Sequence, residues 1–270
     1  MKQNRNRGYR VAPFTLNRRM VAASSSVCKE QNTIHIITEV DVSKPRQLIR
    51  EQAERTGEQL SLTAYITACL SRAVSQHHQC NAMRRGNKVL YLEDVTVSVL
   101  VERDFNSEKT PEPVGIASAQ TKSVSEIHQE IRAAASSLKK HLGALSGMGW
   151  MRFIPSFLLR FCIRMASRSV AIVKRYGVVS VTSIGMFGTG AMWPVPLSGA
   201  TVTLGVGSIV LRPVVVGGEA DGRIEEREHL CLTIALNHDL IDGAPGARFA
   251  TTLAEILSSG DLLRLDSALP

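Results

Sequence analysis

The first strong pattern in the chain is a run of β-branched residues with partial alternation, Thr33–Val42 (TIHIITEVDV), which predicts a β-strand. Apolar residues then recur at helical spacing, first over roughly residues 44–55 and again after Ser61, a residue suited to cap a helix N-terminus. Residues Val89–Val101 return to strand composition and predict one or two strands. The first hundred residues therefore mix strands with helices.

The rest of the chain continues in the same way. A charged segment with two prolines, Glu108–Pro113, predicts a loop, and the polar pattern of Val124–His141 predicts a surface helix. No charged residue lies in Tyr176–Leu211, but its glycines and prolines exclude a continuous membrane helix and favour two buried strands joined by a Gly-rich loop. A further strand and a helix are predicted at Leu230–Leu236 and about Ala247–Leu257.

One segment combines basic and apolar residues. In residues 150–176 the side chains of Arg160, Arg164 and Arg168 recur every four positions, which places them on one face of a helix. We expect a helical hairpin that packs on the domain with its arginines in water, since long basic side chains commonly extend from surface helices. Contact with a membrane surface is the less favoured alternative.

These elements predict an α+β fold in a single domain, because no internal repeat and no interdomain linker interrupts them. Residues 1–15, rich in arginine and asparagine without apolar periodicity, are expected to form a basic N-terminal arm. The domain is expected to span residues 16–270, with residues 148–176 as a basic amphipathic helical insertion.

Charge and cysteine content narrow the class of partner. The formal net charge of +8 favours an anionic partner, but the basic segments lack the interleaved aromatic residues of a single-strand binding platform, so we expect no nucleic acid. The five cysteines are scattered without a CxxC pair, which argues against a disulfide framework and a zinc ribbon. We therefore expect a cytoplasmic protein with no bound metal, and the basic start is not followed by the apolar region of a secretory signal.

The most informative chemistry lies in Leu232–Leu257, LTIALNHDLIDGAPGARFATTLAEIL. Here His238 stands at the end of a predicted buried strand, with Asp242 and Gly243 four and five residues later. An imidazole on a rigid element, followed by a turn that needs glycine, suits a general base. A histidine at a strand end is also commonly a structural, hydrogen-bonded residue. The HxxxDG motif alone leaves both readings open.

The flanks of this motif resemble the acyltransferase component of 2-oxo acid dehydrogenase complexes, whose core is shared with chloramphenicol acetyltransferase. The strand, the HxxxDG turn and the AxxARF helix together carry the resemblance, which covers roughly residues 14–260. Further blocks match in the same order: Asn17–Ser24 (NRRMVAAS), Thr33–Ser43, Val178–Gly190 (VVSVTSIGMFGTG) and Ala200–Val215 (ATVTLGVGSIVLRPVV).

The resemblance implies a chloramphenicol acetyltransferase-like two-layer sandwich, with helices packed on a mixed β-sheet. It also implies a CoA-dependent acyltransferase whose active site is a channel between subunits of a homotrimer or a larger homo-oligomer. Coenzyme A and a dihydrolipoyl thiol enter that channel from opposite ends. Coenzyme A and acyl-CoA are expected as substrates, with no covalently bound cofactor, and other dehydrogenase-complex subunits are expected as partners.

Mapped onto this chain, the resemblance makes His238 the general base and Asp242 the carboxylate that braces the site by pairing with Arg18 or Arg19. The base is needed because a free thiol has a pKa of about 8.5. Thr182 stands at the position of the hydroxyl that stabilises the oxyanion.

A second hydroxyl, that of Ser183, is the neighbouring candidate for the oxyanion. A well-placed donor of this kind contributes roughly 3 kcal/mol.

The chain also departs from the family pattern. The usual Asp-His-Arg is replaced by Asn237, His238 and Asp239, and Met148–Tyr176 is longer and more basic than the family's linker. No lipoyl domain is recognisable before residue 14, so any lipoyl group is expected in trans. Two alternatives to the thiol-dependent enzyme are an acetyltransferase with a hydroxyl acceptor and an inactive oligomeric scaffold.

Overall fold

The computed structural model describes residues 9, 11–105, 108–137, 154–185, 190–217 and 222–267, and these form two layers. One layer is a mixed sheet of six strands in the order β1-β8-β7-β6-β4-β5. Strand β6 runs parallel to its two neighbours, β4 and β7, and the other pairs run antiparallel. Its strands are β1 (Thr33–Asp41), β4 (Val97–Phe105), β5 (Glu108–Ile116), β6 (Val179–Ser183), β7 (Val202–Val216) and β8 (Arg223–Asn237).

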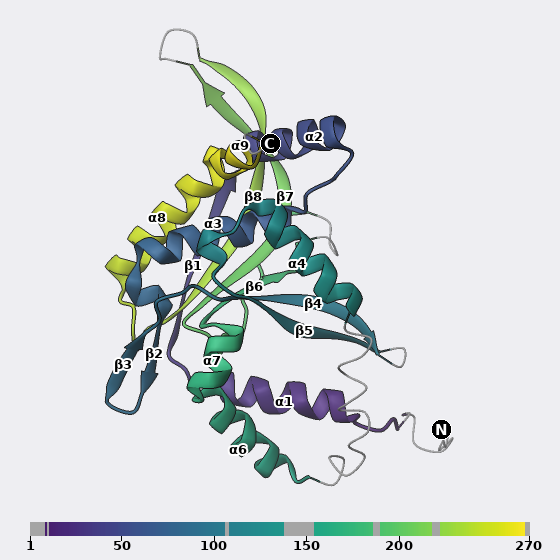
Figure 1. Cartoon of the computed structure of the whole chain (residues 1–270), viewed down its shortest axis with the longest axis vertical. Helices are drawn as coiled ribbons and strands as arrows, with labels where there is room; N and C mark the ends of the chain where they lie inside the picture. Colours follow the sequence, from purple (N-terminus) through teal and green to yellow (C-terminus); the bar gives the residue numbers. More distant parts are fainter. Residues whose placement is uncertain are drawn as a thin grey trace.

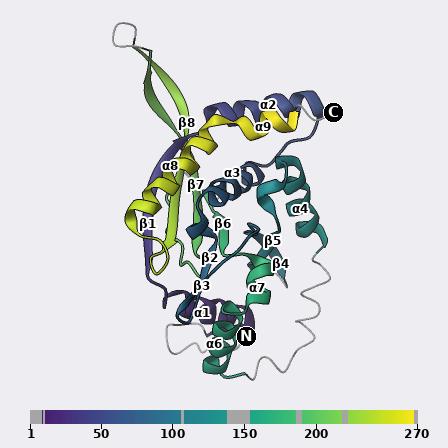
Figure 2. The same ribbon diagram turned by 60° about the vertical axis from the view of Figure 1, so that its left-hand side comes forward.

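Helices form the second layer, as Figures 1 and 2 show. One face of the sheet is covered by α2 (Ser43–Thr56), α3 (Leu62–Gln76), α4 (Val124–Ser137), α8 (Gly243–Ser259) and α9 (Asp261–Ser267). The lower end of the molecule in both views holds α1 (Leu16–Cys28), α6 (Ser156–Ser167) and α7 (Val170–Tyr176). A separate hairpin joins β2 (Ala82–Arg85) to β3 (Lys88–Tyr91). This arrangement confirms the predicted α+β fold.

The core lies between the sheet and the helices. Helix α3 is buried along most of its length, and the Ser61 side chain caps its first turn by accepting a hydrogen bond from the Ala64 amide at 3.2 Å, as predicted. Buried Tyr65 donates its hydroxyl to the Leu257 carbonyl at 2.8 Å, which ties α3 to α8. Successive side chains of β8 point to opposite faces of the sheet, so Leu232, Ile234 and Leu236 face the helices. The last residues of β8 are thereby fixed by packing.

The prediction of a loop at Glu108–Pro113 is wrong, because these residues belong to β5. Proline lacks a backbone donor and is therefore excluded from central strands, but β5 lies at the edge of the sheet and pairs only with β4. Pro113 stands opposite Leu100 in this pairing. The end of the predicted helix at residues 138–141 falls outside the described residues.

Strands β7 and β8 extend past the end of β1 as a long hairpin, which projects at the top of Figure 1. One face of the hairpin carries exposed apolar side chains: Leu211 is 61% exposed, Val215 is 71% exposed and Ile224 is 73% exposed. Val215 and Ile224 are directly paired across the two strands. The hairpin therefore presents an apolar surface that nothing in this single chain covers, over the residues that the structure describes.

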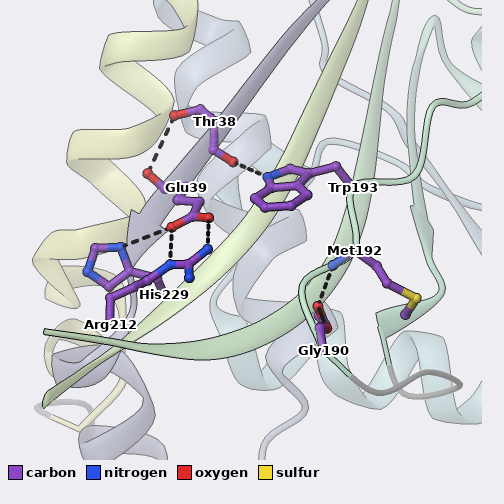
Figure 3. A network of polar contacts seen from close by, with 8 residues as sticks. Thr38, Glu39, Gly190, Met192, Trp193, Arg212 and His229 are labelled. Atoms are coloured by element: carbon purple, nitrogen blue, oxygen red, sulfur yellow. Dashed lines mark hydrogen bonds and ion pairs between the residues drawn. The ribbon is translucent and has the colours of Figure 1, made fainter.

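The base of the hairpin is fixed by the polar network of Figure 3. Arg212 of β7 donates two hydrogen bonds to the Glu39 carboxylate of β1, at 2.6 and 2.9 Å, and His229 of β8 lies 3.9 Å from it. The hydrogen bonds from Arg212 hold the pKa of Glu39 below its usual value. The Trp193 indole donates to the Thr38 carbonyl at 3.2 Å. Three strands and the loop after β6 are thus joined where the hairpin leaves the sheet.

Candidate active site

The candidate site begins where the buried strand β8 ends. Asn237 is its last residue, opposite Thr33 of β1, and His238 follows in a turn. The His238 amide donates to the Asn32 carbonyl at 2.7 Å, so the backbone of this residue is held by the segment before β1. Its imidazole is 46% exposed. A histidine with a fixed backbone and an accessible ring can exchange protons with a bound molecule.

The two residues that depart from the family pattern hold the turn together. The Asn237 side-chain oxygen accepts a hydrogen bond from the Asp239 amide at 3.0 Å, and its carbonyl accepts from the amides of Leu240 and Ile241. The Asp239 carboxylate lies at the centre of a further pair of contacts.

That carboxylate accepts from Asn32 Nδ2 at 2.9 Å and from Arg84 Nη1 at 3.0 Å. The hydrogen bonds from Asn32 and Arg84 hold the pKa of the Asp239 carboxyl below its usual value. Sequence separations of 207 and 155 residues divide Asp239 from these partners, so no local pattern could reveal the contacts. The turn is therefore held by residues from distant parts of the chain.

Asp242 lies on the other side of the turn as the N-cap residue of α8. Its Oδ1 is 3.7 Å from His238 Nδ1, and its side chain is 82% exposed. An exposed pair of this length adds little to stability, but the carboxylate is placed to orient the imidazole. The structure thus brings together the predicted base and the predicted bracing carboxylate.

The two predicted arginines lie elsewhere in the single chain. Both are in the first turn of α1, where Arg18 is exposed and Arg19 donates to the Ile154 carbonyl ahead of α6. Within the described residues of one chain, neither arginine contacts Asp242, whose ion pair is with His238. The pairing of Asp242 with Arg18 or Arg19 stays a prediction.

The predicted oxyanion residues lie at the end of β6. Thr182 stands opposite Gly205 of β7, which in turn stands opposite Thr233 of β8. His238 is five residues beyond Thr233, so Thr182 and the imidazole are separated by about 16 Å along the sheet and two strand spacings, about 10 Å, across it. One copy of the chain does not bring Thr182 to His238.

The two hydroxyls of β6 face opposite sides of the sheet. Ser183 shares the helix-covered face with buried Val181, whereas Thr182 faces the opposite side of the sheet with Thr233. Thr182 is therefore the better placed of the two to meet a ligand outside the helix layer.

The loop after β6 lies close against the face of the sheet that is opposite the helix layer. A Cβ at Gly205 would meet the Pro194 carbonyl oxygen at 2.9 Å, and a Cβ at Gly207 would meet that of Met192 at 1.8 Å. Glycine is required at both positions because only a bare backbone allows this approach. The segment from residue 190 therefore packs beside Thr182, while residues 186–189 of the predicted Gly-rich loop fall outside the described residues.

A cavity of about 520 Å³ lies next to the turn, between α1, the β2–β3 hairpin and α6–α7. Its walls include the residues on either side of His238 but not His238 itself. Four arginines against two carboxylates give it a positive lining, which favours an anionic ligand. The charged residues are Arg84, Arg85, Arg164, Arg168, Glu30 and Asp239.

Comparison with known proteins agrees with this architecture. The family model described as 2-oxoacid dehydrogenases acyltransferase (catalytic domain) matches residues 6–148 and 175–265. A relative, the lipoamide acyltransferase component of the branched-chain alpha-keto acid dehydrogenase complex of Bacillus subtilis, is 24% identical over 259 residues. That match covers 94% of this chain and 53% of the relative. The chain thus spans about half the length of the curated relatives that match most of it.

Two solved structures share the fold. The cubic core of the pyruvate dehydrogenase multienzyme complex superimposes with a TM-score of 0.68 at 16% identity, over 94% of this chain and 93% of that one. The dihydrolipoamide acetyltransferase of Azotobacter vinelandii gives a TM-score of 0.69 at 16% identity with the same coverage, and its structure addressed the catalytic roles of a serine, a histidine and an asparagine. Because the family model matches most of its length, the chain belongs to the 2-oxoacid dehydrogenase acyltransferase family.

Proposed function

We propose that this protein transfers an acyl group between coenzyme A and a dihydrolipoyl thiol, with His238 as the general base. The observation that carries the proposal is the turn after β8, which fixes the His238 backbone, leaves its ring 46% exposed and places Asp242 3.7 Å from Nδ1. The family match supports the reaction class. The Azotobacter vinelandii enzyme supports the pairing, because its histidine and asparagine are also four residues apart.

The proposed reaction begins with proton transfer from the attacking thiol to the imidazole of His238. Imidazole titrates near neutral pH, whereas a free thiol has a pKa of about 8.5, so the base raises the thiolate population at the site. The thiolate attacks the carbonyl carbon of the thioester, and a tetrahedral intermediate forms with its charge on oxygen. The intermediate expels the other thiolate, which takes the proton from the imidazolium. Asp242 stabilises the imidazolium while the proton is held there.

We propose that the hydroxyl of Thr182 donates to the tetrahedral oxyanion from a second copy of the chain. Two observations support a shared site: the separation between Thr182 and His238 within one copy, and the uncovered apolar face of the β7–β8 hairpin. A homotrimer would provide both the missing hydroxyl and a cover for the hairpin. The cubic core among the structural neighbours supports such an assembly and a larger one built from it.

The basic cavity beside the turn supports coenzyme A as the substrate. Its four arginines and two carboxylates leave excess positive charge, and coenzyme A carries several phosphate groups. The matched relative is a lipoamide acyltransferase component, which supports a lipoyl group as the acceptor, supplied in trans or by a segment outside the sequence described here.

The test is acyl exchange from acetyl-CoA, and from a panel of longer acyl-CoAs, to free dihydrolipoamide. Product should be measured as acyl-dihydrolipoamide by chromatography, because substrate and product both carry thiols. We expect turnover by the wild type and a loss of at least ~10²-fold in His238→Ala. A matched control is His35→Ala, which removes another exposed histidine from the neighbouring strand β1 and should retain activity.

Two outcomes would contradict the proposal. Equal turnover in the wild type and His238→Ala would show that His238 is not the general base. No turnover in either protein would favour a hydroxyl acceptor or an inactive scaffold. Coenzyme A binding, measured by calorimetry, then separates these two alternatives, because a scaffold with no substrate site would not bind it.

A further inference from the structure

Helix α6 presents an apolar face to the surface. Phe157 is 67% exposed, Phe161 is 56% exposed and Met165 is 54% exposed, and the four-residue spacing places them on one side of the helix. Leu158, which is 41% exposed, widens the same face. Isolated apolar residues are common on protein surfaces, but four adjoining ones on one helix indicate a contact site.

The opposite side of α6 is fastened to the protein, so the apolar face is held outward. Leu159 is buried, α6 packs mainly on α1, and Arg164 pairs with Glu30 beyond the end of α1. Arg19 of α1 donates to the Ile154 carbonyl just before α6. The arginine row was predicted to lie in water, and Arg160 and Arg168 are exposed, whereas Arg164 pairs with Glu30. The exposed apolar residues on the outer side of α6 were not predicted.

Positive charge runs along one border of the apolar face. Arg160 and Arg168 are exposed on either side of Arg164, and Lys174 and Arg175 follow on α7. The sequence contains no aspartate or glutamate between Glu130 and Glu219, so neither helix carries a carboxylate of its own. Glu30 is the acidic neighbour that faces α6, and Arg164 neutralises it.

This combination fits the surface of an anionic lipid bilayer. An interfacial helix buries its aromatic and aliphatic side chains at the boundary of the acyl chains, while bordering arginines reach the phosphate groups. In the part of the chain that the structure describes, no helix is long and apolar enough to span a membrane. A partner surface without negative charge would leave the arginine row uncompensated.

The position of α6 keeps this face apart from the proposed subunit contact. The helix lies at the end of the molecule opposite the β7–β8 hairpin in both views (Figures 1 and 2). The family model matches residues 6–148 and 175–265, so α6 falls in the segment between the two matched parts. The helix is therefore an addition to the family's common domain.

We propose that α6 binds this protein to anionic membrane surfaces, through Phe157, Phe161 and Met165 in the lipid interface and Arg160 on the phosphates. This inference does not rest on the acyl-transfer proposal, because it depends only on the exposed face and charge of α6.

The experiment is sedimentation of the full chain with vesicles made of equal parts phosphatidylcholine and phosphatidylglycerol, beside vesicles of phosphatidylcholine alone. We expect binding to the mixed vesicles that weakens as salt is raised, and much weaker binding to the neutral vesicles. The double variant Phe157→Ser, Phe161→Ser should bind at least ~10-fold more weakly. Arg160→Gln removes one charge that does not line the basic cavity, and it should weaken binding about fivefold.

A matched control is Val89→Ser with Tyr91→Ser, two exposed apolar residues of β3, which should leave vesicle binding unchanged. All variants change exposed side chains, and unaltered thermal unfolding would establish that they fold. Sedimentation velocity without vesicles tests the competing occupant, a second copy of the chain. Absent binding by the wild type, unchanged binding by the phenylalanine variant, or a change in its assembly size would each overturn the proposal.

Discussion

The ends of strands β8 and β6 carry the two halves of the proposed site, and they differ in how far one chain completes them. At the end of β8, contacts from Asn32, Arg84 and Asn237 hold the turn around His238. At the end of β6, the Thr182 hydroxyl faces the side of the sheet opposite the helix layer, far from the imidazole. A single chain therefore builds the proposed base with its support, while the proposed oxyanion donor would have to come from a second copy of the chain.

The largest loss of activity is expected when the proposed subunit contact is disrupted. The variant Val215→Glu, Ile224→Glu places two charges on the apolar face of the hairpin, and burying them in a subunit contact is costly. We expect monomers by sedimentation velocity and loss of acyl transfer below detection, although the His238 turn is untouched. Monomers that retain full activity would show that one chain is sufficient. The exposed pair Val89→Glu, Tyr91→Glu on β3 serves as the control.

A second variant removes only the proposed hydroxyl donor at the end of β6. Thr182→Val keeps the shape of the side chain and deletes its hydroxyl, so kcat should fall by about 10²–10³-fold while the assembly persists. Ser183→Ala, on the opposite face of the same strand, should change kcat much less. If Ser183→Ala shows the larger loss, the roles of the two hydroxyls are reversed. Steady-state kinetics with acetyl-CoA and dihydrolipoamide measures both.

A smaller effect is expected at the support of the turn. Asp239→Asn weakens the contact with Arg84, in which the arginine is 57% exposed and the carboxylate 28% exposed. We expect a loss of about 1 kcal/mol in the free energy of unfolding, or ~2–4 °C in Tm, together with a several-fold loss of kcat. Calorimetry and steady-state kinetics measure the two effects. An unchanged kcat would show that the network holds the fold without orienting His238.

The pH dependence of stability gives the smallest predicted effect. The pKa of Asp239 is lowered in the folded protein. Its contribution to the free energy of unfolding is therefore fully present above the unfolded-state pKa of about 3.9 and is lost as the pH falls through the folded-state pKa. The Tm difference between the wild type and Asp239→Asn should therefore be constant near neutral pH and shrink below about pH 5. A difference that widens on acidification would contradict the assigned sign.

Local pattern predicted much of this fold, because burial on a strand or helix leaves a periodic trace. The strand from Thr33, the capped helix after Ser61 and the turn at His238 all follow from such traces. The strand β5 was missed because its prolines resemble those of a loop, and only its edge position makes them acceptable.

The rest could not be read from the sequence because it depends on distant contacts. Asp239 meets Arg84 and Asn32 only after the sheet has formed, and the separation of Thr182 from His238 depends on strand register. The outward face of α6 is likewise invisible in its periodicity, since apolar residues lie on both its inner and outer sides.

The most direct test of a shared site is complementation between two inactive variants. His238→Ala and Thr182→Val proteins should be unfolded together, refolded as a mixture, and assayed for acyl transfer to dihydrolipoamide beside each variant refolded alone. If the base and the oxyanion donor come from different copies, mixed assemblies contain some sites with both residues intact, and activity should rise well above the sum of the separate variants. Activity no greater than that sum, in mixtures shown to contain both chains in one assembly, would contradict the account.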